Sequence, residues 1–356
     1  MAVLCAERPG WPPTPLMIGR KGIDGRVSTL QPPTAPEPSG SDLIQRSRRW
    51  LAWGVALAAL LYVGFSVWIG LTEVQEALQR FLWLYYIPAI LLTLLNYALR
   101  FWKWHYLLGR LGVKIGVAED ARIFGAGLAM VLSPGKVGEV LKPWLVRERT
   151  GTPLTHTIPA LITERLTDGI ALLVLAAISV STYAGEHSQY VFVPIALTAF
   201  GLAVLASQTI SMAILNTLAK LPLVNRIAGR LIEMYTAMRI CLAPAPLVIT
   251  VLMSMVAWGG ECVGYWLVLR GFGADPTLGL STFLYAFATV SGGASPGGLG
   301  IADGVLVELP RRLVAGLDPG AALGSAMLIR LATLWLGVVI GAVALVGVGV
   351  KRPNPT

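Results

Sequence analysis

Long apolar segments alternate with short polar stretches over most of this chain. A helix needs about 20 apolar residues to cross a bilayer. Six segments provide that length, namely residues 50–70, 81–108, 159–183, 191–209, 246–269 and 319–350. Pro159 suits the first turn of its helix, where a missing amide donor costs nothing. The pattern therefore predicts an all-α, polytopic membrane protein with about six full spans.

Two further apolar segments, residues 121–132 and 279–290, are too short to cross. Each has about 12 residues, and a helix of this length is about 18 Å long, whereas the hydrocarbon core is roughly 30 Å thick. Both segments lead into a Ser-Pro-Gly sequence, and a second short helical segment follows, ending near residue 146 in the first case and covering 303–314 in the second. We predict two re-entrant helical hairpins, each of which enters and leaves the membrane on one side.

The hairpins belong to an internal repeat of two halves, about residues 81–184 and 245–350. Shared apolar composition would explain matching leucines but not two Ser-Pro-Gly-x-x-Gly loops at an offset of 162 residues. Three blocks match in the same order: 104–112 with 265–273, Ser133-Pro134-Gly135 with Ser295-Pro296-Gly297, and 160–165 with 326–330. The basic residues place the opening of the first hairpin at the cytoplasm and that of the second outside. The repeat is therefore inverted, an arrangement found in transporters.

The composition excludes an ordinary soluble domain. Hydrophobic residues make up 55% of the chain and charged residues 13%, whereas a soluble domain has roughly a quarter charged residues. The net charge of +9 indicates basic cytoplasmic loops rather than nucleic-acid binding. The basic residues that we assign to cytoplasmic helix ends are Arg46, Arg48, Arg49, Lys103, Arg110, Lys114, Lys142, Arg147, Arg149, Lys351 and Arg352.

This charge pattern predicts an integral, multi-pass protein of the inner membrane with both termini in the cytoplasm. Residues 1–40 hold eight of the 23 prolines and no periodic apolar pattern. Such a composition cannot form a core, so we expect a disordered cytoplasmic tail over residues 1–45, without a secretory signal. Residues 46–350 form the predicted transmembrane domain.

Ionisable residues inside spans are energetically costly and are therefore candidates for function. Arg100 and Glu261 occupy corresponding positions 161 residues apart, so they can pair or contact a substrate. In the alternative interpretation, Arg100 extends to the interface and Glu261 accepts a hydrogen bond from a hydroxyl. Glu164 and Asp168 share a helix face, and Arg165 can pair with Asp168 at i,i+3. This group either closes the hairpin structurally or contacts the substrate.

The two loops suit an anion, because free amides at helix N-termini and arginine guanidinium groups both bind phosphate. Arg165 and Arg330 correspond in the two halves and form a symmetric pair of cations for a headgroup phosphate. Lys136, Glu139 and Asp303 flank the loops, and the two acids can gate, titrate or cap the half-helices. The candidate substrate-binding residues are Arg100, Ser133, Pro134, Gly135, Lys136, Gly138, Glu139, Glu164, Arg165, Asp168, Glu261, Ser295, Pro296, Gly297, Gly298, Gly300, Asp303 and Arg330.

Motifs for common enzymes are missing from the sequence. It contains no Walker A, HExxH or GxSxG sequence, and the three histidines (His105, His156 and His187) are scattered without ligand spacing. We therefore predict no catalytic residue, metal or cofactor.

Four motifs together resemble the lysylphosphatidylglycerol synthase transmembrane-region family of flippase-like membrane proteins, over roughly residues 45–350. They are Arg100-Phe101-Trp102-Lys103-Trp104, the loop from Ser133 to Glu139, Glu164-Arg165-x-x-Asp168, and the loop from Ser295 to Gly300. The resemblance implies a lipid flippase, since family members move aminoacylated phosphatidylglycerol or are linked to polyprenyl-phosphate sugars, glycolipids or hopanoid lipids. It also assigns the family's acidic residue after the second loop to Asp303. Nothing in the chain resembles the soluble aminoacyltransferase domain, so synthase activity is not implied.

The sequence thus predicts a flippase that moves a phosphate-containing lipid between leaflets, passively or coupled to an ion. Its expected partners are a membrane lipid with an anionic headgroup and, as a second candidate, a lipid-modifying enzyme. Two alternatives stay open. The chain could be a membrane transferase that uses a lipid-linked donor, with Asp168 or Glu139 as the base. It could also be a non-transporting partner of a lipid-modifying enzyme.

Overall fold

The computed structural model describes residues 71–133, 138–181 and 228–347, and in addition residues 60, 64 and 217. All of them belong to one compact unit, residues 40–356. The predicted tail (1–45), most of the predicted span 50–70, the predicted span 191–209 and the loop residues Pro134, Gly135 and Lys136 lie outside the described residues.

The described residues form helices and turns, without strands. The first half contains α2 (Leu71–Arg80), η1 (Trp83–Tyr85), α3 (Tyr86–Arg110), α4 (Val117–Ala129), η2 (Met130–Leu132), α5 (Leu141–Thr150) and α6 (Leu154–Ser181). The second half contains α10 (Ala228–Cys241), α11 (Pro244–Gly271), α12 (Leu278–Ser291), η4 (Gly292–Ala294), η5 (Pro296–Gly298), α13 (Ile301–Leu313), α14 (Pro319–Arg330), η6 (Leu331–Trp335) and α15 (Leu336–Gly347).

Three helical segments in the described part are long and apolar enough to cross a membrane: Trp83–Arg110, Pro244–Gly271 and Pro319–Gly347. Helix α6 has 28 residues, but Glu164, Arg165 and Asp168 interrupt its apolar sequence. The chain is therefore an all-α polytopic membrane protein, as predicted.

Helix α6 begins at Leu154, earlier than the predicted start at Pro159. Gly151 ends α5 in the left-handed region with φ of 71°, and the amide of His156 already donates to the Pro153 carbonyl at 3.0 Å. Pro153 therefore stands at the helix start, where proline is favourable. Pro159 lies inside the helix, at the loss of one backbone hydrogen bond.

The two halves have glycines with positive φ at corresponding turns. Gly112 after α3 and Gly273 after α11 have φ of 77° and 80°, and the residue after each glycine donates its amide back to its helix. Gly151 after α5 and Gly316 after α13 have φ of 71° and 74°. Side chains other than glycine rarely adopt this left-handed conformation, so these four glycines mark the repeat in the backbone itself.

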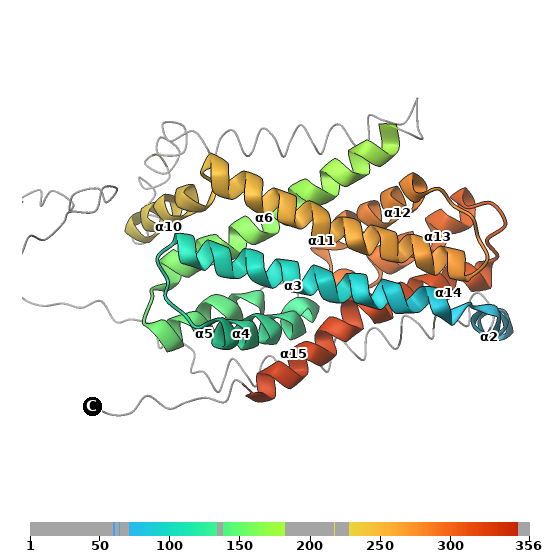
Figure 1. The fold of residues 1–356 in the computed structure, drawn as a ribbon, viewed down its shortest axis with the longest axis horizontal. Coiled ribbons are helices and arrows are strands. Elements are labelled where there is room, and N and C mark those ends of the chain that lie inside the picture. The colour runs from blue at the N-terminus through green and yellow to red at the C-terminus, as the bar shows by residue number, and fades with distance from the viewer. Residues whose placement is uncertain are drawn as a thin grey trace, which may run out of the picture. The chain divides into compact units, whose positions relative to one another are not determined.

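Helices α3 and α11 pack side by side in opposite directions (Figure 1). The amide of Leu82, before α3, donates to the carbonyl of Gly271, at the end of α11, at 2.9 Å. Small residues allow close packing, since a Cβ atom at Gly264 would lie 3.6 Å from the backbone of Ala89. Because equivalent helices run antiparallel, the repeat is inverted.

The two hairpins follow from this inversion. The α4–α5 hairpin starts from the end of α3 and the α12–α13 hairpin from the end of α11, so they lie toward opposite ends of the helices in Figure 1. Their tips meet, since η2 contacts η5. Leu132 of the first tip and Leu299 of the second pack in one apolar cluster with Leu334 and Val338. Side chains of both halves therefore converge at the centre.

Candidate functional site

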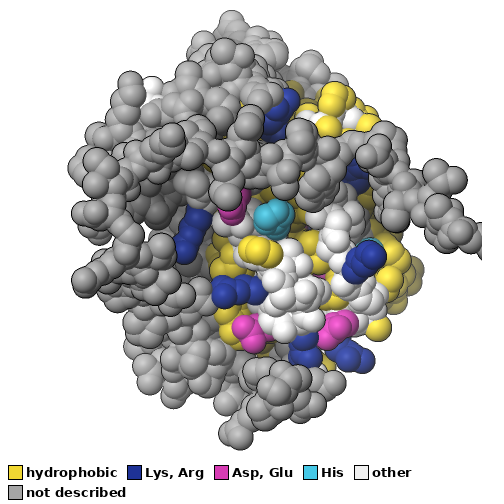
Figure 2. All heavy atoms as spheres, turned by 90° about the vertical axis from the view of Figure 1, so that its left-hand side faces the viewer, with side chains coloured by type: hydrophobic (Ala, Val, Ile, Leu, Met, Phe, Trp, Pro, Cys, Tyr) yellow, Lys and Arg dark blue, Asp and Glu magenta, His cyan; other side chains and the backbone are white. Residues whose placement is uncertain are grey.

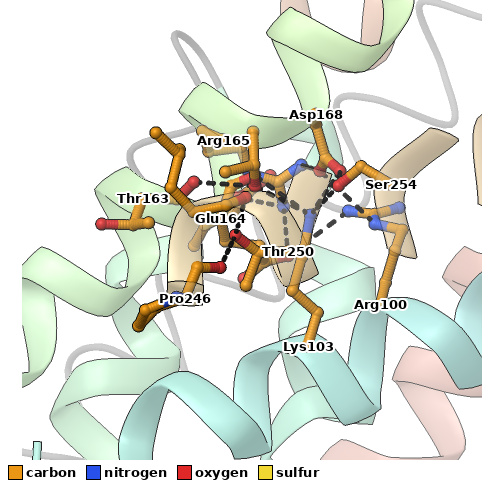
Figure 3. Close-up of polar contacts among 12 residues, drawn as sticks. Arg100, Lys103, Thr163, Glu164, Arg165, Asp168, Pro246, Thr250 and Ser254 are labelled. Carbon is orange, nitrogen blue, oxygen red and sulfur yellow. Dashed lines mark hydrogen bonds and ion pairs between the residues drawn. The ribbon is translucent and has the colours of Figure 1, made fainter. Parts of the chain in front are cut away.

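A buried network of ion pairs and hydrogen bonds joins α3, α6 and α11 (Figure 3), and an ion pair of Lys142 adds α5. Lys103 of α3 lies at its centre, with Nζ 2.5 Å from Asp168 Oδ1 and 2.7 Å from Ser254 Oγ. It also donates to the carbonyl oxygen of Glu164 at 3.2 Å. The Lys103 side chain is fully buried, so these acceptors must replace the water that its ammonium group has lost.

A second buried lysine, Lys142 of α5, pairs with Glu164 through Nζ and Oε2 at 2.5 Å. Its Nζ also lies 4.4 Å from the centroid of the Trp104 ring and 5.0 Å from that of Phe124. Gly127 leaves room for the lysine stem, because a Cβ atom there would lie 2.5 Å from Lys142 Cγ. The first hairpin is thus fastened to α3 and α6 by one ammonium group.

Arg165 of α6 and Arg330 of α14 make equivalent ion pairs in the two halves. Arg165 Nη2 lies 2.6 Å from Glu139 Oε2, and Arg330 Nε lies 2.8 Å from Asp303 Oδ1. Both acids stand at the start of the returning half of a hairpin. The predicted pairing of Arg165 with Asp168 is present, at 3.7 Å. Each arginine therefore links a long helix to the neighbouring hairpin.

Arg100 is held less closely than these cations. Its ion pairs with Glu164 and Asp168 are both 3.7 Å long, and each of these acids already binds a lysine at 2.5 Å. Its buried Nε donates no hydrogen bond to any described residue, as is also true of Arg165 Nε and Arg330 Nε, and its guanidinium carbon lies 5.6 Å from the centroid of the Trp258 ring. Arg100 therefore presents an incompletely paired guanidinium group.

Glu261 forms no ion pair with Arg100 within 4 Å among the described residues. Its Oε2 instead accepts a hydrogen bond of 2.6 Å from the hydroxyl of Tyr285. This contact agrees with the alternative that assigned Glu261 a hydroxyl donor. The direct pairing predicted for the two halves is absent because α6 presents two acids, Glu164 and Asp168, to Arg100.

Both Ser-Pro-Gly loops are held by their own hydrogen bonds. The amide of Gly138 donates to Ser133 Oγ at 2.8 Å, and the amide of Gly300 donates to Asp303 at 2.9 Å. The amide of Gly298 donates to a carbonyl of its own loop at 3.0 Å. These three amides are therefore engaged within their own loops, and the expectation that loop amides bind an anion stays a prediction. The arginines are better placed for that role.

The second loop folds around Arg330. It runs from Ser295 through Pro296, the first residue of η5, to Gly297, whose carbonyl accepts a hydrogen bond of 2.5 Å from Arg330 Nη2. Gly298 has φ of 77°, and a Cβ atom there would lie 3.4 Å from both terminal nitrogens of the arginine. The loop thus needs glycine for its backbone conformation and also for close approach to the guanidinium group.

Two cavities adjoin the network. The first, of about 50 Å³, lies beside Glu139 and Arg165, and the second, of about 110 Å³, lies beside Glu261 and Arg330. Arg100 lines both. Each cavity is large enough to admit water.

Tyr97 and Thr333 lie in the wall that the two cavities share. The Tyr97 hydroxyl donates to the carbonyl of Thr333, which belongs to the π-helical turn η6. Such turns displace carbonyls from the α-helical pattern and are frequent at functional sites. Gly337 makes room for the ring, because a Cβ atom there would lie 2.7 Å from the Tyr97 oxygen.

Sequence reasoning missed the central role of two lysines. Lys103 and Lys142 were assigned to cytoplasmic helix ends, but both are buried in the ion-pair network. Helix α3 continues for seven residues beyond Lys103, about 10 Å at 1.5 Å per residue. The depth of Lys103 within its helix was the signal in the sequence that it is buried.

Within the described residues, no group of three His, Cys, Asp or Glu side chains could hold a metal ion.

Charged side chains reach the surface at both ends of the helices, and Figure 2 shows the end where α3 leads into α4. Among the described residues at the end of α3, the start of α4 and the end of α5, five are basic and three are acidic: Arg110, Lys114, Arg122, Arg147 and Arg149 against Glu119, Asp120 and Glu148. Among the described residues of the connecting segments at the opposite end, four are basic and five are acidic: Arg80, Arg270, Arg311 and Arg312 against Glu73, Glu76, Asp275, Glu308 and Asp318. The first end is therefore the more basic.

The inverted halves, the paired hairpins and the buried charges at their meeting point define a polytopic helical membrane protein built as an inverted repeat. The sequence model of the lysylphosphatidylglycerol synthase transmembrane region matches residues 51–341, and the chain belongs to this family.

Two relatives from Methanothermobacter thermautotrophicus (strain ATCC 29096 / DSM 1053 / JCM 10044 / NBRC 100330 / Delta H), both called UPF0104 membrane protein, are similar over most of their length. One is 25% identical over 318 residues, covering 81% of this chain and 90% of the relative. The other is 24% identical over 318 residues, covering 82% and 92%.

Proposed function

We propose that this protein moves a lipid with a phosphate-bearing headgroup between the two leaflets of the membrane in which it lies. The observation that carries the proposal is the position of Arg100. It lines both cavities, one beside each hairpin, and its guanidinium group is incompletely paired. A planar guanidinium group binds phosphate through two parallel hydrogen bonds and stays charged in a buried site.

The headgroup would pass from one cavity to the other along three guanidinium groups. Arg165 lines the first cavity, Arg100 both, and Arg330 the second. The hydrogen bond between Tyr97 and Thr333 stands between the cavities and must open for passage. Acyl chains would remain in lipid, so only the headgroup would need the polar route.

The uneven distribution of basic residues supports an orientation. The end with Arg110, Lys114 and Arg122 is the more basic, and basic loops are typical of the cytoplasmic side. We therefore place the opening of the α4–α5 hairpin at the cytoplasm and that of the α12–α13 hairpin outside. The same rule puts both termini in the cytoplasm, and the membrane that we propose is the inner membrane.

The transferase alternative assigns a general base to Asp168 or Glu139. Both acids are engaged, Asp168 with Lys103 at 2.5 Å and Glu139 with Arg165 at 2.6 Å. A general base needs a free carboxylate within reach of the proton that it takes. The observed contacts therefore favour transport over transfer chemistry.

The test is translocation of fluorescent phosphatidylglycerol in phosphatidylcholine proteoliposomes, measured by quenching of the outer leaflet. We expect R100Q, R165A and R330A each to slow translocation at least about tenfold, because a charge-assisted hydrogen bond contributes about 1.5–3 kcal/mol. The matched control is R270Q, which removes an arginine from the ion pair with Asp275 at the C-terminal end of α11. Unchanged rates in R165A and R330A would refute the site, and no translocation by the wild type would refute the function.

A further inference from the structure

Glu261 differs from the other acids at the centre of the molecule. Four central carboxylates each lie within 2.8 Å of a lysine or arginine nitrogen: Glu139, Glu164, Asp168 and Asp303. Glu261 is equally buried, with 3% of its surface exposed, but its described hydrogen-bond partner is the neutral hydroxyl of Tyr285. A buried carboxyl group without a countercharge is stabilised by holding a proton.

The same comparison singles out one cation. Lys103, Lys142, Arg165 and Arg330 each have a carboxylate within 2.8 Å, whereas the nearest carboxylates of Arg100 are 3.7 Å away. Arg100 and Glu261 line the same 110 Å³ cavity. The described centre therefore contains four close ion pairs, one incompletely paired cation and one unpaired acid.

We propose that Glu261 is a proton-binding site coupled to the lipid phosphate, so that one proton and one phosphate anion bind together. Four close pairs contribute no net charge. With Glu261 ionised, the charges of the described central side chains sum to zero, and the Glu261 carboxylate attracts Arg100. With Glu261 protonated, the centre carries one positive charge, and Arg100 is available to a phosphodiester. Binding that monoanion restores neutrality, which keeps the cost of charge inside the membrane low.

The groups around Glu261 are consistent with this exchange. Tyr285 donates to it from α12, and Arg100 and Tyr97 from α3 and Arg330 from α14 line its cavity. Arg330 is held by Asp303 and by the loop carbonyl of Gly297. Arg100 is therefore the cation whose pairing changes when Glu261 gains or loses a proton. In the step itself, the Glu261 carboxylate gains a proton from water as the phosphate reaches Arg100, and it returns the proton when the phosphate leaves.

This inference rests on the proposed function, and binding tests it separately from transport. The probe is dihexanoyl phosphatidylglycerol, added to the detergent-purified full chain over a series of pH values around neutrality. If one proton is taken up with each lipid, the dissociation constant falls by up to about tenfold for each unit by which the pH decreases. E261Q should bind with an affinity that does not change with pH. The matched control E76Q, in an exposed ion pair with Arg80, should retain the wild-type slope.

A second variant guards against loss of folding in E261Q. Y285F keeps the carboxyl group but removes the hydroxyl that donates to it, so the midpoint of the binding curve should move to higher pH. Wild-type affinity that is independent of pH, or an E261Q slope equal to that of the wild type, would overturn the inference. If fluorescent phosphatidylglycerol still crosses in proteoliposomes, only the proton coupling fails. If the wild type moves no lipid, the proposed function fails.

Discussion

Replacing Lys103 by methionine should destabilise the protein strongly, because it leaves Asp168 buried without its closest countercharge. Lys103 Nζ lies 2.5 Å from Asp168 Oδ1, and both side chains are almost completely buried. Breaking a buried ion pair by removing one partner costs about 3–5 kcal/mol. Asp168 keeps Arg100 and Arg165, each at 3.7 Å, so we expect the lower end, about 3 kcal/mol.

Thermal unfolding of the detergent-purified protein, followed by fluorescence-detected size exclusion, measures this effect. At roughly 2–4 °C per kcal/mol, the melting temperature of K103M should fall by roughly 6–12 °C. The double variant K103M/D168N removes the orphaned charge and should be more stable than the sum of the two single changes predicts. R80M, in an exposed pair with Glu76, should melt as the wild type does. Strictly additive single changes, or K103M melting like the wild type, would refute this account of the network.

Three further changes test the described contacts by the same melting assay. Y97F leaves the carbonyl of Thr333 without its donor and should cost about 1–3 kcal/mol; wild-type stability would argue against the bond. G298A should lower the free energy of unfolding more than the control G316A does. Both glycines have positive φ, but only Gly298 has neighbours within 4 Å. Equal losses in the two variants would mean that only backbone strain, and no close contact, accounts for the cost. G264A should be tolerated and G264L should not, because Gly264 faces α3 at van der Waals distance; tolerance of both would contradict close packing there.

Much of the fold could be predicted because membrane crossing requires long apolar helices, and short apolar segments stand out against them. Segments predicted over 121–132 and 279–290 correspond to α4 with η2 and to α12. The repeated Ser-Pro-Gly loops identified the two halves. In the second loop, Gly297, Gly298 and Gly300 have positive φ, a conformation that other residues rarely adopt. The start of α6 could not be predicted from Pro159, because a proline earlier in the chain, Pro153, was equally suited to a helix start.

The candidate site was less predictable, for a reason visible in Arg100. Its rarity inside a span marked it as important, and its place in the repeat suggested Glu261 as partner. Which acid comes closer depends on the packing of α6 against α3, which periodicity does not specify. Lys103 and Lys142 illustrate the same limit, because a lysine near a helix end can either reach water or turn inward toward a buried acid.

The two halves share one design but enclose spaces of unequal size, about 50 Å³ beside Arg165 and about 110 Å³ beside Arg330. In an inverted duplicate, each half can adopt the shape that its twin displays. If each half adopted the conformation of the other, the first chamber would widen and the second would narrow. The contacts needed would be of types already present in the structure. Under the proposed transport function, the difference between the two chambers is a template for the opposite-facing state, and a crosslink that fixes one chamber at its present width should stop the transport cycle.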